Sequence, residues 1–249
     1  MDKVRILNID VHNFTMNDLL SSLTKGIVFT PNVDHLVKLQ KDIEFFRIYS
    51  QADYVVPDSA IIVALSKLIG PGLKERINGA DLFAEFCRYR AQDENTRVFM
   101  LGGLGEVASR AKENINLRFG RRIVVDAMSP TAGFESRIDE CSDIVDRINR
   151  SDANVLAVCV GAPKQEKWIA AYKSRLPKVD LFFAIGATID FEAGTLRRAP
   201  AWMQRAGLEW LFRLTQDPVR LWKRYLFDDP PFLYYIALQI LGLYRNPFG

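Results

Sequence analysis

The sequence predicts an α/β protein with a Rossmann-like, mostly parallel sheet and helical crossovers, followed by a helical C-terminal appendage. Up to Gly194, short apolar runs alternate with helical patterns, which is the rhythm of parallel strands joined by helices. Beyond Gly194 the strand pattern stops, and the chain is aromatic and basic, with breaks predicted at Gly207, Pro218 and Pro230-Pro231. We therefore expect an α/β core at residues 1–194 and a helical appendage at residues 195–249.

The expected elements follow one another at regular spacing. Apolar runs bounded by polar or turn residues predict strands at residues 4–9, 26–30, 53–56, 97–101, 122–126, 155–160 and 180–185. A first short helix is indicated by Thr15 and Asp18, whose spacing resembles a capping box. Helical patterns also fit residues 34–50, 59–69, 79–91, 105–119, 135–150 and 163–174.

Composition and charge limit the class of protein. The three cysteines, Cys87, Cys141 and Cys159, have neither metal-ligand nor CxxC spacing, so we expect reduced thiols in an intracellular chain. We recognise no signal peptide at the start, and no apolar run reaches the roughly 18 residues that would indicate a membrane-spanning helix. The net charge is +3, but residues 197–224 alone carry seven basic and two acidic residues. Such a local basic segment indicates a binding partner.

Polar and glycine residues follow several of the predicted strands. Ligands of parallel α/β sheets gather beyond the carboxyl ends of the strands. The candidate binding segments are therefore residues 30–32, 57–59, 102–105, 126, 161–165 and 186–190.

The segment around Gly103 has the form of a dinucleotide fingerprint. Gly103, Gly105 and Ala108 follow a predicted strand and open a predicted helix, and Asp126 ends the next strand. Backbone N–H groups at Gly102–Gly105 could approach a diphosphate, while Asp126 could accept a hydrogen bond from a ribose hydroxyl. A tight strand-to-helix turn that simply requires glycine explains the same pattern, and the pattern does not distinguish a nicotinamide cofactor from a nucleotide-sugar.

Two further strand ends carry candidate polar groups. Asp58 could act as a general base, or it could only cap the helix that follows. Lys164 and Gln165 follow Pro163 at a predicted helix start, where they could bind phosphate or sugar hydroxyls or lie in solvent.

Metal chemistry is not expected. The only histidines are His12 and His35, and no Asp-x-Asp sequence occurs. A bound diphosphate would then need protein cations, which Arg76 and the basic appendage could supply, although such arginines are also common on solvated surfaces.

The end of the appendage is strongly apolar. Residues 232–244 contain no charge and follow several tryptophans and arginines. This composition suits an interfacial element on anionic lipid, but an ordinary buried helix or a dimer interface would give the same pattern.

Together these segments resemble the WecG/TagA/CpsF family of bacterial glycosyltransferases (glycosyltransferase family 26) over nearly the whole chain. The segments that carry the resemblance are TPNVDH (30–35), VPDS (56–59), ERINGADL (75–82), GAPKQEKWI (161–169), RRAP (197–200) and GLEWLFRLTQDPVR (207–220). One departure is Ser59, because the family usually has glycine after the aspartate.

The resemblance implies an inverting, metal-independent enzyme. It would move N-acetylmannosamine, its uronic acid or glucose from a UDP-sugar to a polyprenyl-diphosphate-linked saccharide, in the synthesis of cell-surface polysaccharides such as wall teichoic acid or exopolysaccharide. The UDP-sugar is a substrate, and no cofactor is implied. The protein would be cytoplasmic and peripheral on the inner face of the cell membrane, with a homo-oligomer as an option for its assembly and no nucleic-acid partner.

The resemblance also implies site residues. Asp58 would be the base, Thr30 would position sugar hydroxyls, and Arg76 would stabilise the charge that grows on UDP. Gln165 would meet the donor or acceptor sugar. Residues 1–194 would bind the nucleotide-sugar, and residues 195–249 would close the active site and touch the membrane, with three arginines meeting the diphosphate: Arg213, Arg220 and Arg224. The expected donor-binding residues are Asn32, Gly102, Gly103, Gly105, Asp126, Gly161, Lys164, Gln165 and Asp190.

Two other functions would use the same residues. An NAD-dependent oxidoreductase would use the glycine fingerprint and Asp126. A non-catalytic, membrane-bound scaffold would retain nucleotide binding without turnover.

Overall fold

The computed structural model describes residues 2–249 and divides into two compact units. The first unit combines residues up to Met16 with Thr30–Asn78 and Arg198–Gly249. The second unit combines Asn17–Phe29 with Gly79–Arg197. The division between residues 1–194 and 195–249 stays a prediction about which segments carry which function, because compactness alone does not assign function.

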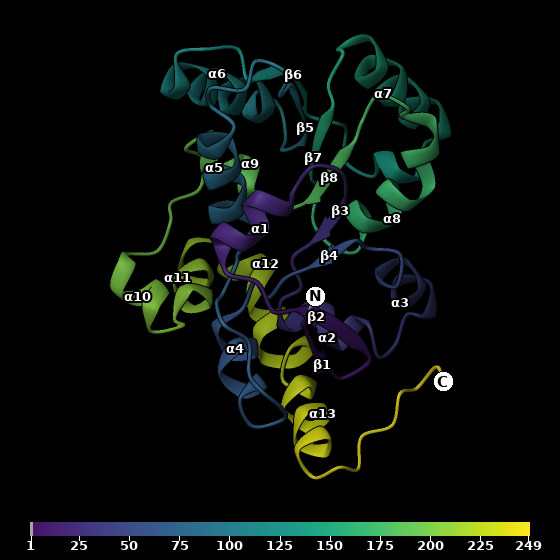
Figure 1. Ribbon diagram of the computed structural model, residues 1–249, viewed down its shortest axis with the longest axis vertical. Helices are drawn as coiled ribbons and strands as arrows, with labels where there is room; N and C mark the ends of the chain where they lie inside the picture. Colours follow the sequence, from purple (N-terminus) through teal and green to yellow (C-terminus); the bar gives the residue numbers. More distant parts are fainter. Residues whose placement is uncertain (1) are drawn as a thin grey trace. The chain divides into compact units, whose positions relative to one another are not determined.

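The larger sheet confirms the predicted fold class. Its strand order is β4-β3-β8-β7-β5-β6, and the pairs from β3 to β6 are all parallel (Figure 1). Strands β5 and β7 are buried along their whole length, which explains their continuous apolar runs. The strands are β3 (Gly26–Phe29), β4 (Tyr54–Val55), β5 (Val98–Gly102), β6 (Val124–Met128), β7 (Val155–Cys159) and β8 (Leu181–Ala184).

Helices cover both faces of the sheet in the second unit. Helices α6 and α9 lie on one face, and α7 and α8 lie on the other (Figure 1). Helix α9 falls in a segment for which the sequence analysis predicts no helix. The helices are α1 (Met16–Ser22), α5 (Gly79–Tyr89), α6 (Val107–Phe119), α7 (Ile138–Arg150), α8 (Lys164–Tyr172) and α9 (Thr188–Glu192), with 3-10 turns η1 (Phe134–Ser136) and η2 (Lys173–Arg175).

The first unit begins with an antiparallel hairpin, so the prediction of one strand at residues 4–9 is wrong. Strand β1 (Lys3–Ile6) pairs with β2 (Ile9–His12), and Leu7 and Asn8 form the turn. Leu7 has a φ of 51° and is buried. An apolar residue in a left-handed turn conformation is unusual, and its side chain makes the turn look like strand in the sequence.

The single helix predicted at residues 34–50 is two helices. Helix α2 (Val33–Lys38) ends before Leu39, and α3 (Ile43–Tyr49) begins after Asp42. The Asp42 side chain accepts a hydrogen bond from the Phe45 backbone N–H and so caps the second helix. Helix α4 (Ala60–Ser66) follows β4.

The C-terminal segment is helical and broken near the predicted residues. It comprises α10 (Ala201–Arg205), α11 (Glu209–Gln216), α12 (Pro218–Lys223), a π-helical turn η3 (Arg224–Asp228) and α13 (Pro231–Ile240). Glycine and proline explain the breaks, because Gly207 has a left-handed φ of 72° and Pro218 and Pro231 each begin a helix.

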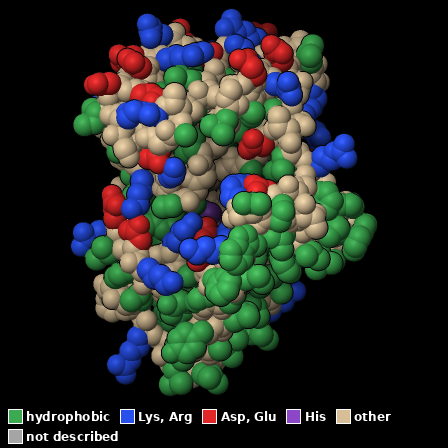
Figure 2. Space-filling model, turned by 180° about the vertical axis from the view of Figure 1, so that it is seen from behind, with side chains coloured by type: hydrophobic (Ala, Val, Ile, Leu, Met, Phe, Trp, Pro, Cys, Tyr) green, Lys and Arg blue, Asp and Glu red, His purple; other side chains and the backbone are tan. Residues whose placement is uncertain are grey.

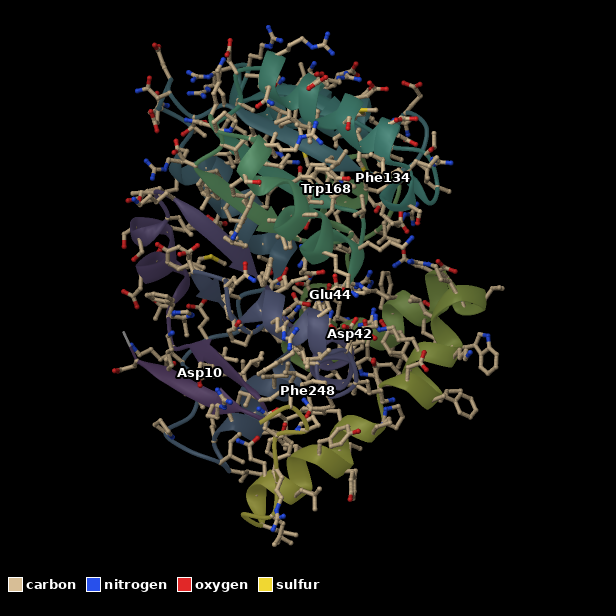
Figure 3. The ribbon with its side chains drawn as sticks, turned by 90° about the vertical axis from the view of Figure 1, so that its right-hand side faces the viewer. Asp10, Asp42, Glu44, Phe134, Trp168 and Phe248 are labelled. Carbon is tan, nitrogen blue, oxygen red and sulfur yellow. The ribbon has the colours of Figure 1, made fainter. Side chains whose placement is uncertain are left out.

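This C-terminal segment packs on other residues of the first unit. Phe232 and Ile236 of α13 are buried, and the Gln239 side chain hydrogen-bonds the backbone of Arg5 and Leu7. At the chain end, the Phe248 ring lies 5.5 Å from the Phe46 ring of α3, close to Asp42 (Figure 3).

Candidate active site

Asp58 lies between β4 and α4, on a backbone segment that is fixed on both sides. Its N–H donates to the Pro31 carbonyl oxygen (3.0 Å), and the neighbouring Pro57 carbonyl accepts from the Ile77 N–H (2.9 Å). The helix cap is Ser59, and its side chain makes no capping hydrogen bond. The structure therefore does not support a capping role for Asp58.

The surroundings of Asp58 raise the pKa of its carboxyl group. Burial raises the pKa of the Asp58 carboxyl, and the negative charge of Glu209 adds to this effect. Arg76 and Arg213 act in the opposite direction, but the pKa stays above its ordinary value. A carboxylate with a raised pKa is a better proton acceptor, as a general base requires.

Arg76 is held at three points. Its Nε donates to the Asp58 carbonyl oxygen (2.8 Å), and its Nη2 meets Glu209 Oε2 at 2.5 Å. Its Nη1 reaches the Gln204 carbonyl oxygen at 3.4 Å. The guanidinium therefore joins the Asp58 turn to α10 and α11.

Thr30 and Asn32 follow β3 and belong to the first unit. Thr30 is buried, with 7% of its surface exposed. Asn32 is the N-cap of α2, and its Oδ1 accepts hydrogen bonds from the His35 backbone N–H and from Arg224 Nη2 (3.2 Å). Asn32 thus has a structural role whether or not it also binds a sugar.

The three appendage arginines have different surroundings. Arg224 lies beside Asn32, with its Nε 3.6 Å from Asp229 and 4.0 Å from Asp34. The Nε atoms of Arg213 and Arg224 are buried without a hydrogen-bond partner within residues 2–249. Arg220 is exposed and pairs with Asp217 at 2.5 Å. Arg213 and Arg224 therefore belong to the charged surroundings of Asp58, whereas Arg220 does not.

Sequence reasoning missed the acidic partners of these arginines. Glu209 pairs with Arg76, while Asp34 and Asp229 lie beside Arg224. No local pattern reveals such pairs, since Glu209 is 133 positions from Arg76. Asn32 was recognisable as a helix cap, because asparagine before an apolar helical pattern is a start signal.

In the second unit, close packing explains why two positions of the fingerprint, Gly102 and Gly103, are glycine. A Cβ at Gly102 would lie 2.4 Å from the Cys159 carbonyl oxygen, and a Cβ at Gly103 would lie 2.5 Å from Val107. Around Gly105 a Cβ would meet nothing within 4 Å. The Ala108 N–H donates to Ser129 Oγ. These contacts support the tight-turn alternative, and the diphosphate role stays a prediction.

Asp126 lies in the middle of β6 and not at its end. Arg147 donates to both of its carboxylate oxygens, at 2.8 and 3.0 Å, and Lys112 lies 3.8 Å away. Burial opposes ionisation of Asp126, but these cations and the Ala127 N–H lower its pKa. Asp126 is thus an ion-pair partner in this structure, so the ribose contact would have to compete with Arg147.

Gln165 joins the ends of two strands. Its Oε1 accepts from the N–H groups of Gly161 (3.2 Å) and Gly186 (2.9 Å), and its Nε2 donates to Glu166 (2.9 Å). Gln165 and Glu166 are both buried. The amide thus holds the loops after β7 and β8, where sequence reasoning assigned it only to a ligand.

Lys164 and Asp190 have partners of their own within the second unit. Lys164 Nζ pairs with Glu135 at 2.5 Å, and both side chains are partly exposed. The Asp190 carbonyl oxygen accepts from the N–H groups of Thr195 and Leu196, which orders the chain after α9. Their predicted contacts with a donor stay predictions.

A broad apolar face covers the C-terminal helices. Figure 2 shows hydrophobic side chains gathered over this segment of the first unit. The exposed residues are Trp202, Trp210, Leu211, Val219, Trp222, Leu226, Phe227, Leu233, Tyr234, Ile240, Leu241 and Leu243.

Within residues 2–249, no helix has the length and apolar character needed to cross a membrane. The described residues also contain no group of three or more His, Cys, Asp or Glu side chains placed to hold a metal ion.

The fold and these residues define a Rossmann-like α/β protein with a candidate general base among arginines. A sequence model of the glycosyl transferase WecG/TagA/CpsF family matches residues 4–246. The chain belongs to this family of glycosyltransferases.

Two relatives have established names. One is an N-acetylglucosaminyldiphosphoundecaprenol N-acetyl-beta-D-mannosaminyltransferase from Bacillus subtilis (strain 168), 28% identical over 91% of this chain and 88% of the relative. The other has the same name, comes from Bacillus spizizenii (strain ATCC 23059 / NRRL B-14472 / W23), and is 30% identical over 81% of this chain and 75% of the relative. Both names describe enzymes that transfer N-acetylmannosamine to a lipid-linked diphosphate acceptor.

Proposed function

We propose that this chain transfers a hexose from a UDP-sugar to a polyprenyl-diphosphate-linked saccharide, with inversion at the anomeric carbon and without a metal ion. The names of the two relatives favour N-acetylmannosamine over its uronic acid or glucose as the hexose, and a lipid-linked N-acetylglucosamine as the acceptor. The reaction would serve cell-surface polysaccharide synthesis.

The observation that carries this proposal is the environment of Asp58. A partly buried carboxylate with a raised pKa lies on a fixed backbone segment and has arginines around it. Asp58 removes the proton of the acceptor hydroxyl as its oxygen attacks the anomeric carbon. The bond from that carbon to the UDP oxygen breaks on the opposite face, and UDP leaves with the electron pair.

The arginines have separate tasks in this reaction. The Nε atoms of Arg213 and Arg224, which are buried without a hydrogen-bond partner in the described chain, would donate to a diphosphate. Arg76 holds the Asp58 turn through the backbone. Thr30 and Asn32 would orient sugar hydroxyls. Arg220, exposed and paired with Asp217, would take part only after leaving that partner.

The second unit supplies candidate contacts for the donor. The turn at Gly102–Gly105, Gly161 and Lys164 follow strand ends of the parallel sheet, where nucleotides bind in this fold class. Gln165 would act by holding the loops at Gly161 and Gly186 in place. To contact the donor, Asp126 and Asp190 would have to replace the contacts that they make in this structure or add new ones to them.

We further propose that the apolar face of the C-terminal helices rests on the membrane that holds the acceptor lipid. Exposed tryptophan and tyrosine side chains favour the boundary between water and hydrocarbon. Residues 197–224, with seven basic and two acidic residues, would add attraction to anionic lipid. In this proposal the protein would be peripheral on the inner face of the cell membrane. Dimer formation through the same face is the competing use of these side chains.

The test is a transfer assay with UDP-N-acetylmannosamine, UDP-glucose and related donors, each with a lipid-linked N-acetylglucosamine diphosphate and with EDTA. We expect transfer without metal. Asp58→Asn should lower kcat by roughly 10²–10⁴-fold, because the amide cannot accept the proton. Binding of UDP, measured by calorimetry, should stay near the wild-type value.

Asp10→Asn is the matched control, because Asp10 is an exposed carboxylate of the same unit that pairs with Arg5. It should transfer sugar at the wild-type rate. If Asp58→Asn keeps near-normal turnover, Asp58 is not the base. Intact UDP binding with no transfer from any donor by the wild-type protein would instead indicate a non-catalytic scaffold.

A further inference from the structure

Gln165 and Glu166, at the start of α8, form a buried pair that joins two loops of the second unit. The loops follow the neighbouring parallel strands β7 and β8. Gln165 Oε1 accepts from the Gly161 N–H of one loop (3.2 Å) and from the Gly186 N–H of the other (2.9 Å). Only the oxygen of an amide can accept, so these two donors determine which way the Gln165 side chain is turned.

The other end of the Gln165 amide depends on Glu166. Gln165 is 3% exposed, so its Nε2 needs an acceptor in the interior of the protein. Glu166 Oε1 provides one at 2.9 Å, and Glu166 is itself 0% exposed. Without this acceptor the buried amide N–H groups would lose a partner, and the side chain would gain by turning to another acceptor. Such a turn would release both glycine N–H groups.

The two glycines border open space. Gly161 and Gly186 have left-handed φ angles of 82° and 52°, which glycine adopts without strain. Apart from chain neighbours, a Cβ at either position would meet no atom of the described residues within 4 Å, so close packing does not explain these two glycines. Both lie beyond the carboxyl ends of parallel strands, where ligands of such sheets bind. A ligand can therefore approach the backbone of both loops.

We propose that Glu166 is a positioning residue for the donor: it keeps the Gln165 amide oxygen on the Gly161 and Gly186 N–H groups, so that the two loops present a fixed backbone surface to a UDP-sugar. This inference rests on the proposed function, which supplies the identity of the donor. Because Glu166 is fully buried, it acts through Gln165 and not by touching the donor. Loops that are ordered before binding reduce the entropic cost of binding, so the effect falls on donor affinity.

The experiment compares Glu166→Leu, which removes the acceptor at a similar side-chain size, with Glu166→Gln, which keeps an acceptor oxygen. Exchange of the Gly161 and Gly186 N–H groups with deuterium is followed by ¹H–¹⁵N spectroscopy of the full chain without ligand. The Kd of UDP-N-acetylmannosamine is measured by calorimetry without acceptor. The KM for this donor and the kcat are measured in the transfer assay.

We expect the two glycine N–H groups of Glu166→Leu to exchange at least about tenfold faster than in the wild-type protein, because they lose a fixed acceptor. The Kd and the KM for the donor should rise by roughly tenfold, as expected for one lost hydrogen bond. The kcat should change little, because the loops contact the donor alike in the ground state and in the transition state. Glu166→Gln should keep all of these values near those of the wild-type protein, since its amide oxygen still accepts from Gln165.

Glu192→Leu is the matched control, because Glu192 is a buried glutamate of the same unit whose carboxylate pairs with Arg118 at 2.8 Å. It should leave glycine exchange and donor binding at wild-type values, whatever its effect on the melting temperature. Unchanged glycine exchange in folded Glu166→Leu overturns the proposal, as does an equal defect in Glu166→Gln. Faster exchange with an unchanged donor Kd also overturns it, because Glu166 would then be structural only.

An exchange of donor and acceptor serves if Glu166→Leu does not fold. Gln165→Glu keeps an oxygen for the two glycine N–H groups but faces Glu166 with a second acceptor, so it should show the losses expected of Glu166→Leu. Adding Glu166→Gln to it restores one donor and one acceptor and should recover donor binding. No recovery in this double variant overturns the proposal.

The outcomes also separate this inference from the proposed function. If the wild-type protein binds the UDP-sugar and Glu166→Leu loses affinity, but no sugar is transferred, the proposed function fails and the role of Glu166 stands. If the wild-type protein transfers sugar while glycine exchange is unchanged in Glu166→Leu, the role of Glu166 fails and the function stands. If the wild-type protein binds no UDP-sugar, both fail.

Discussion

At the scale of single residues, Asp229 is the clearest case of a carboxyl group whose burial opposes its ionisation. It follows the π-helical turn, and its side chain is 13% exposed. Burial raises the pKa of Asp229 to about 6, even though Arg224 lies nearby and acts to lower it. Asp34, the other acid beside Arg224, keeps a lowered pKa, because Arg224, His35 and Lys38 outweigh its burial.

The raised pKa of Asp229 predicts a pH dependence of stability. Between the ordinary value of 3.8 and about 6, the folded protein holds a proton that the unfolded chain releases, so the free energy of unfolding falls as pH rises. Asp229→Asn cannot lose this proton. Between pH 4 and pH 7.5, the variant should therefore gain up to about 3 kcal/mol relative to the wild-type protein in urea unfolding.

Asp228→Asn is the control for this prediction, because Asp228 is exposed and adjacent in sequence. Its stability curve should run parallel to that of the wild-type protein. If the Asp229→Asn curve is also parallel across this pH range, Asp229 ionises in the folded state at an ordinary pKa, and the burial argument is wrong.

Residues that act through neighbours in sequence could be predicted, and those that act through distant partners could not. Asp58 was identified because it follows a strand and precedes a helix, both of which are local patterns. The roles of Glu209 and of Gln165 depend on contacts with Arg76 and Gly186, which only the folded chain brings near. The contact of Asp126 with Arg147 is likewise invisible in the sequence and changes how Asp126 can act.

At the scale of elements, α13 is fastened to the β1–β2 hairpin. Gln239 Oε1 accepts from the Leu7 N–H at 2.7 Å, and its Nε2 donates to the Arg5 carbonyl oxygen at 2.9 Å. Nearby, the Tyr244 hydroxyl donates to Gln40 Oε1 at 2.6 Å. The Gln239 side chain therefore pairs with one backbone donor and one backbone acceptor of the hairpin that the sequence did not reveal.

This contact predicts a measurable loss of stability in Gln239→Ala. The Leu7 N–H would be left without its acceptor beside a buried side chain, which costs about 1–3 kcal/mol. Urea unfolding followed by far-ultraviolet circular dichroism measures this loss. Gln51→Ala is the control, because Gln51 is an exposed glutamine of the same unit and should change stability little. Equal stabilities of the two variants would show that the Gln239 contact is replaced by water at no cost.

Helices and strands with a continuous apolar pattern in the sequence were predicted correctly. Elements separated by a turn that carries no clear sequence signal were not. Strands β5 and β7 are fully buried apolar runs and were found within two residues of their observed ends. The hairpin was missed because Leu7 continues the apolar pattern through the turn. The break between α2 and α3 was missed because residues 39–42 contain neither glycine nor proline, and the cap at Asp42 is the only local signal.

At the scale of the whole molecule, the first unit consists of three separate segments of the chain. The C-terminal segment, Arg198–Gly249, contributes buried side chains to it, with Leu221 at 4%, Phe232 at 1% and Ile236 at 3% exposure. Burying one such side chain contributes roughly 1.5–3 kcal/mol, so the three together approach the whole free energy of unfolding of a typical domain. The first unit should therefore not be stable without its C-terminal segment.

Deleting residues 198–249 should unfold the first unit while the second unit persists. The strands of the second unit pair with one another, and an unfolded Thr30–Asn78 would be a long loop whose length adds little entropic cost. Hydrogen exchange followed by mass spectrometry should show lost protection in α2 and in the β1–β2 hairpin, with retained protection in β5 and β7.

Deleting only residues 245–249, which keeps Gln239 and Tyr244, should leave protection in all four elements. If α2 and the hairpin stay protected in the longer deletion, residues 1–194 fold as a core without the appendage, as the sequence division implies. If β5 and β7 also lose protection, the two units unfold as one cooperative structure.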